Sequence, residues 1–113
     1  VDRIWQILSE LGKSFEEVES LILVRKASDK LVYVAFYPGE RIKENIPKDL
    51  IKLLIEADFS INNLVKVADM GDLSHVILYG SEKSIIFVRK KAGLLAVTTY
   101  SRPSNELLEL LLK

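Results

Sequence analysis

Apolar positions along the chain fall into blocks with either a helical or an extended period. Three blocks repeat every three or four residues and predict helices at 2–11, 48–68 and 106–112. Five short blocks rich in β-branched residues predict strands at 20–25, 31–37, 73–79, 84–89 and 94–100. The resulting order is α-β-β-α-β-β-β-α.

The connections between the predicted strands indicate how the strands pair. Residues 80–83 and 90–93 have the length and polarity of hairpin turns, so the last three strands are expected to form an antiparallel meander. The segment 31–37 is apolar on both faces, which predicts a sheet covered on both sides. We therefore predict an α+β fold with a central five-stranded antiparallel sheet and helices on both faces. A chain of 113 residues fits one domain, 1–113.

The predicted helix at 48–68 is the longest element and carries one continuous apolar stripe. The stripe advances by three or four residues at a time and is predicted to pack on the core, through Leu50, Leu54, Ala57, Ile61, Leu64 and Ala68. On a helical wheel with Lys48 at zero, this stripe occupies about 140–260°.

A second apolar ridge runs along the same helix, outside the predicted core stripe. Ile51, Ile55 and Phe59 are spaced by four and turn toward the polar side of the wheel. Such a ridge usually contacts another helix. Two interpretations remain open: the first or last helix of this chain covers the ridge, or the ridge is a protein interface, most simply a dimer contact.

Composition and charge exclude several classes of function. Sixteen basic residues balance sixteen acidic ones, so no net positive field favours nucleic acid, and we expect no nucleic-acid partner. The chain has no cysteine and one histidine, which leaves no basis for a Cys-ligated or multi-His metal site. No apolar stretch approaches the roughly 18–20 residues of a membrane span, and we expect a cytoplasmic protein. The abundance of Ile, Leu, Val, Lys and Glu is similar to that of thermophile proteins.

Candidate catalytic residues are few. His75 lies near Asp69, Asp72 and Ser74, but adjacent residues on a strand leave opposite faces, so Ser74 and His75 are not expected to hydrogen-bond to each other as nucleophile and base. The glycines form neither of the common phosphate-binding motifs. We therefore predict no enzyme activity, no cofactor and no metal.

Two segments carry a resemblance to a known family. Residues 68–80, with sequence ADMGDLSHVILYG, look like a helix end, glycine turn and third strand; residues 84–97, with sequence SIIFVRKKAGLLAV, look like the fourth strand, turn and fifth strand. In these segments and in its order of elements, the chain resembles the Roadblock/dynein light chain family, which has a profilin-like fold. It departs from the family pattern at Ser28-Asp29-Lys30, where members commonly carry Asp-Gly.

The resemblance implies a non-enzymatic homodimeric adaptor that binds and regulates a small Ras-like GTPase, or a scaffold subunit. Family dimers pair their third strands and place their long helices side by side. Carried onto this chain, the expected dimer or partner interface contains residues of the long helix and third strand: Ile51, Ile55, Phe59, Asn62, Leu73, His75, Val76, Ile77 and Leu78. The alternative is a small-molecule sensor of the PAS or GAF type, which would need a cavity against one sheet face.

Overall fold

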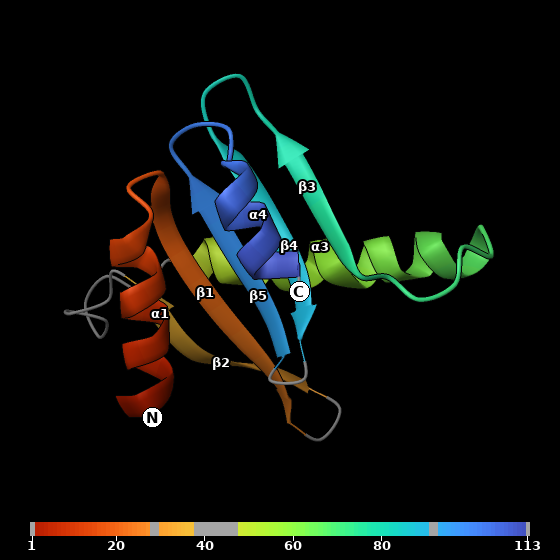
Figure 1. Ribbon diagram of the computed structural model, residues 1–113. Coiled ribbons are helices and arrows are strands. Elements are labelled where there is room, and N and C mark those ends of the chain that lie inside the picture. Colours follow the sequence, from red (N-terminus) through yellow and green to blue (C-terminus); the bar gives the residue numbers. More distant parts are fainter. Residues whose placement is uncertain (1, 28–29, 38–47, 91–92, 113) are drawn as a thin grey trace.

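The computed structural model describes residues 2–27, 30–37, 48–90 and 93–112 (Figure 1). Along the chain the elements are α1 (Asp2–Ser14), β1 (Val18–Ala27), β2 (Lys30–Tyr37), α3 (Lys48–Val67), β3 (His75–Tyr79), β4 (Ser84–Lys90), β5 (Gly93–Thr99) and α4 (Asn105–Leu112).

All strands join one antiparallel sheet in the order β2-β1-β5-β4-β3. β1 pairs with β5, a strand far from it in sequence, through partners such as Leu21↔Val97 and Leu23↔Leu95. Consecutive hairpins join β5, β4 and β3, which leaves β3 at one edge of the sheet. Its outer side has no strand beside it among the described residues.

Alternating residues of β1, β3, β4 and β5 build a separate apolar cluster on each face of the sheet. On one face, side chains such as Leu21, Ile86 and Val97 pack with Leu8 of α1 and Leu107 of α4. The opposite face carries a smaller cluster, formed by Ile22, Val24, Phe87, Leu94 and Ala96 with Leu54 of α3. Figure 1 shows α1 and α4 in front of the sheet and α3 crossing behind it. We refer to these as the α1/α4 face and the α3 face.

The C-terminal end of α3 is closed by backbone hydrogen bonds typical of a Schellman motif. The amide of Met70 donates to the carbonyl of Val65 at 3.0 Å, and that of Asp69 donates to Lys66 at 3.2 Å. Asp69 takes the left-handed conformation that this ending requires, with φ of 55°. Gly71, also at positive φ, then turns the chain back toward β3.

The predicted fold needs correction in the extent of its strands. The predicted strand at 73–79 begins only at His75, because Leu73 and Ser74 belong to the connection from α3. The predicted strand at 20–25 is the longer β1, which starts at Val18. A register shift between Val18 and Ser20 carries β1 past Glu19, a polar position that interrupts the apolar pattern. The predicted turns at 28–30 and 90–93 include positions outside the described residues.

Two further findings concern the part of the chain that the structure describes. No helix there is long and apolar enough to cross a membrane. No group of three or more His, Asp or Glu side chains in that part gathers into a metal-sized site.

Candidate functional site

The face of α3 that packs on the sheet is not the one predicted from the apolar stripe. Leu54, Asp58 and Val65 are buried, whereas Leu64 of the predicted stripe is 64% exposed. On the helical wheel these buried residues centre near about 260°, roughly 60° from the centre of the predicted stripe. The helix is therefore turned about its axis relative to the prediction.

An ion pair lies on the side of α3 that packs on the sheet. The carboxylate of Asp58 on α3 lies 2.6 Å from a guanidinium nitrogen of Arg89, which projects from β4 on the α3 face. The Asp58 side chain is only 10% exposed, and that of Arg89 is 38% exposed. Because an unpaired buried carboxylate is costly, Asp58 points at the sheet only where Arg89 meets it.

The rotation leaves a different apolar stripe exposed, and we call it the α3 seam. Its members are spaced by four, three, four and three residues: Leu53, Ala57, Ser60, Leu64 and Val67. Leu53, Leu64 and Val67 are 60%, 64% and 87% exposed. This spacing is typical of a helix-packing seam, and small residues at its middle permit close approach of a second helix. Sequence reasoning missed the seam although its spacing was visible.

The residues of the predicted ridge do not form one exposed surface in the structure. Ile55 is half-buried and packs against the apolar cluster of the α3 face, so it does not belong to an exposed ridge. Phe59 is 68% exposed. Ile51 lies within α3, but its side chain is outside the described part of the structure. Neither α1 nor α4 covers Phe59, because both helices lie on the other side of the sheet (Figure 1).

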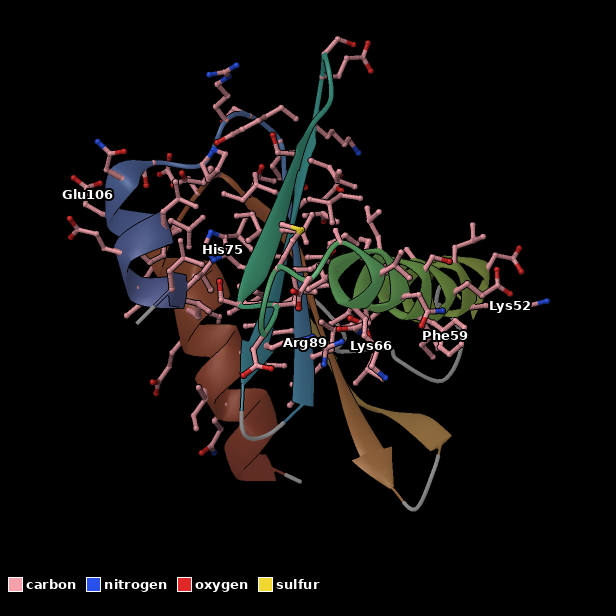
Figure 2. The ribbon with its side chains drawn as sticks, turned by 90° about the vertical axis from the view of Figure 1, so that its right-hand side faces the viewer. Lys52, Phe59, Lys66, His75, Arg89 and Glu106 are labelled. Atoms are coloured by element: carbon pink, nitrogen blue, oxygen red, sulfur yellow. The ribbon has the colours of Figure 1, made fainter. Side chains whose placement is uncertain are left out.

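The sides of α3 can be followed in Figure 2, which views the helix from its C-terminal end. Phe59 and Lys66 lie along its lower side, and Lys52 points away from the sheet. The α3 seam lies about 120° around the helix from Phe59, on the upper side. It therefore borders the part of the α3 face nearest to the β3–β4 hairpin, where Leu78 and Ile85 lie.

The backbone of β3 has hydrogen-bonding groups along the sheet edge that find no strand partner among the described residues. The Gly80 amide donates to Lys83 at 2.8 Å, and the Arg89 amide donates to Ser74 at 3.2 Å. Hydrogen-bonded positions alternate along an antiparallel strand, so the even-numbered residues face β4. The amides and carbonyls of His75, Ile77 and Tyr79 consequently point outward from the sheet.

The side chains predicted for the third-strand interface occupy three environments. Val76 and Ile77 are half-buried, Val76 against the cluster of the α3 face and Ile77 against that of the α1/α4 face. Leu78 is 49% exposed, and His75 is exposed at the start of the strand. Leu73 is half-buried in the preceding connection.

One expectation about His75 is wrong. The hydroxyl of Ser74 and Nδ1 of His75 lie 2.9 Å apart, within hydrogen-bond distance. Alternation across a strand does not separate these side chains because Ser74 precedes the first strand residue. Both are exposed, and the contact is a local one between neighbours in sequence.

A polar cavity lies beside the predicted interface. It has a volume of about 260 Å³ and is lined by residues of the α3 end and the following connection: Asn62, Asn63, Val65, Lys66, Gly71, Asp72 and Leu73. The amide nitrogen of Asn62 is already bound, since Nδ2 donates to the Asp58 carbonyl at 2.9 Å. Ser74 and His75 do not line this cavity.

A network of polar side chains lies at the end of the α3 face nearest the β3–β4 hairpin. The buried hydroxyls of Ser20 and Thr98 are hydrogen-bonded to each other, and Thr98 also donates to Glu19 at 3.2 Å. Lys83 of the hairpin forms an ion pair with the second carboxylate oxygen of Glu19. The hydrogen bond to Glu19 raises the pKa of the Lys83 ammonium above its ordinary value.

This pKa shift gives a prediction about alkaline stability. A group whose pKa is raised on folding stabilises the fold while it is charged in both states, and this stabilisation is lost as the pH rises through the folded-state pKa. Lys83→Met should therefore lower the melting temperature slightly at pH 7, and the difference from the wild type should vanish in strongly alkaline solution. Thermal unfolding followed by circular dichroism across this pH range checks it; an unchanged difference would contradict the assignment.

Comparison with known proteins adds no assignment to this geometry. No protein-family model matches the chain, and no curated protein matches it.

Proposed function

We propose that the protein is a non-enzymatic binding domain that forms a homodimer through β3 and α3 and presents the dimer to a second protein. One observation carries the proposal: an unpaired strand edge and an exposed helical seam lie side by side on the same domain. Large contiguous apolar surfaces and free strand edges both favour association. A two-fold dimer would pair the strand edge and bury the α3 seam in one interface.

The strand edge supports a specific register between two copies. The outward groups belong to His75, Ile77 and Tyr79, so a two-fold axis at Ile77 places Ile77 opposite its own copy and His75 opposite the partner's Tyr79. Every outward amide of β3 then meets a carbonyl. Registers displaced to either side would leave some of these groups unpaired. On the α3 face, Leu78 would lie opposite the partner's Val76.

The helix supports the same two-fold arrangement. In Figure 1, α3 passes β3 near the His75 end of the strand and continues beyond the sheet edge. In the two-fold dimer, the part of α3 that projects beyond the sheet edge would lie over the partner's α3 face, at the Tyr79 end of the partner's β3. Leu78 and Ile85 would thereby be covered by the partner's helix.

In this dimer the two α3 helices lie antiparallel and side by side, and the α3 seam of each faces the other. Asp58 contacts β4, so the residues C-terminal to it lie at β3 and past the edge. Leu64 and Val67 consequently fall close to the two-fold axis. Leu64 and Val67 are 64% and 87% exposed in the single chain, and the contact between the two helices would bury this exposed surface.

The proposed second partner is a small Ras-like GTPase, and this part rests on the resemblance of residues 68–80 and 84–97 to the Roadblock family. Phe59 supports a surface for such a partner. It lies on the side of α3 away from the seam, so its 68% exposed ring would stay accessible in the dimer. Two copies would present two such rings on one side of a continuous sheet.

Nothing in the described residues favours the alternative small-molecule sensor. Side chains pack on both sheet faces in that part of the chain. The cavity of about 260 Å³ lies beside the sheet, between the end of α3 and the following connection.

Sedimentation equilibrium combined with GTPase capture tests the proposed function. The wild type should sediment at twice the chain mass, and the immobilised dimer should retain a small Ras-like GTPase from the source lysate when loaded with GDP or GTP. Phe59→Asp should lower that retention about tenfold or more and leave the dimer mass unchanged, because an exposed aromatic anchor is lost from the partner surface only. A monomeric wild type would refute the dimer; unchanged retention by Phe59→Asp would refute the partner surface.

A further inference from the structure

We propose that the Asp58–Arg89 ion pair selects which face of α3 is turned to the sheet, and thereby keeps the α3 seam exposed. Asp58 and Arg89 are positioning residues in this scheme and touch no partner. The link to dimerisation rests on the proposed function. The effect on helix rotation does not, because it takes place within one chain.

Two apolar stripes compete for the sheet on α3. The predicted one is centred on Leu54, Ala57, Ile61 and Leu64, and it is the better apolar stripe because it carries no charge. In the observed rotation Leu54 is buried, Ala57 and Ile61 are half-buried, and only Leu64 of this set is exposed. The stripe that packs contains a carboxylate in its middle, with Leu54 and Val65 on either side of Asp58. Hydrophobic burial alone would therefore turn α3 by about 60° and place Leu64 against the sheet.

The ion pair opposes this rotation through its geometry. Among the described residues, Asp58 is the only charged residue that is buried, with 8% of the whole residue exposed. Its contact with Arg89 is 2.6 Å, and turning the helix would swing the carboxylate off the guanidinium. Buried ion pairs often add little stability compared with apolar residues of similar volume, and in some proteins they specify one arrangement over another. Here the selected arrangement is the one that leaves Leu64 outward.

The absence of cysteine from the chain makes the rotation measurable with single introduced thiols. The reporters are Leu64→Cys, Asn62→Cys and Phe59→Cys, each placed in the wild type and in the Arg89→Met variant, which leaves the Asp58 carboxylate without its partner. Labelling rates are compared at dilutions where the chain is monomeric, so that no partner covers the reporters. Thiol reactivity follows exposure of the sulfur.

If the ion pair sets the rotation, the Arg89→Met variant should label about tenfold more slowly at Leu64→Cys and faster at Asn62→Cys. Phe59→Cys should label at the same rate in both backgrounds, since that position faces solvent in either rotation. The Asp58→Leu/Arg89→Met double variant should label like the wild type, because it also removes the charge from the packed stripe, and it controls for loss of the Arg89 side chain.

Thermal stability distinguishes selection of a face from simple structural support. The Arg89→Met variant should still unfold in one cooperative transition while its dimer dissociation constant rises about tenfold or more, because the seam is turned inward. Faster labelling at both Leu64→Cys and Asn62→Cys would mean that α3 merely loosens, and it would overturn the inference. Unchanged labelling at both positions would also overturn it. A wild type that is monomeric at every concentration would refute the proposed dimer and leave the labelling result interpretable.

Discussion

Replacing His75 by proline is expected to convert the dimer largely to monomer. The His75 amide points outward from β3, so proline would remove a donor to the partner strand and set its ring against that strand. The two-fold axis repeats this loss, so two hydrogen bonds are lost in each dimer. At about 1–2 kcal/mol each, the dissociation constant should rise about 30- to 1,000-fold. Sedimentation equilibrium measures it.

The matched control for this variant is His75→Ala. Alanine removes the imidazole and its contact with Ser74 but keeps the outward amide. The dissociation constant of the dimer should therefore stay close to that of the wild type. The fold should survive both changes, because the hydrogen bond from Arg89 to Ser74 lies on the inner side of the strand. Equal effects of proline and alanine would mean that the side chain, and not the strand edge, makes the contact.

Local sequence patterns located most helices and strands to within a few residues. The long helix was predicted at 48–68 and is observed as Lys48–Val67, because apolar residues recur at helical spacing throughout that segment without Gly or Pro. The end of β1 at Val18 was missed, since the chain passes Glu19 through a register shift that no periodic pattern encodes. Such a shift depends on pairing with a strand some eighty residues away.

The face of α3 was predicted wrongly for a related reason. Counting apolar residues chose the stripe through Ala57, Ile61 and Leu64, because a carboxylate within a core stripe counts against it. Asp58 is nevertheless buried, since Arg89 from β4 reaches it. The pairing of two charges 31 positions apart is a tertiary contact. Sequence spacing on one helix contains no information about it.

The Ser74–His75 contact was missed because the start of β3 was placed two residues too early. With Ser74 counted as a strand residue, alternation puts its side chain opposite that of His75. The observed strand begins at His75, and Ser74 is free to turn back onto the ring. Assignments that rest on side-chain alternation are thus most vulnerable at the ends of strands.

The α3 seam makes a second prediction with a large expected effect: Leu64→Glu should abolish the dimer at micromolar concentration. Leu64 falls near the proposed two-fold axis, so the variant would bring two carboxylates together in a surface from which water is excluded. Like charges placed together at an interface cost several kcal/mol, which corresponds to a dissociation constant raised about 100-fold or more. Size-exclusion chromatography with light scattering gives the mass directly.

Leu64→Glu should not unfold the monomer, and this separates the seam from the core. The side chain is 64% exposed in the single chain, and substitutions at such positions usually change the free energy of unfolding by no more than about 0.5 kcal/mol. Phe59→Glu introduces the same charge on the opposite side of the same helix, so it should leave the dimer intact. If Phe59→Glu dissociated the dimer and Leu64→Glu did not, the interface would lie on the Phe59 side, and the two-fold arrangement built on the α3 seam would be wrong.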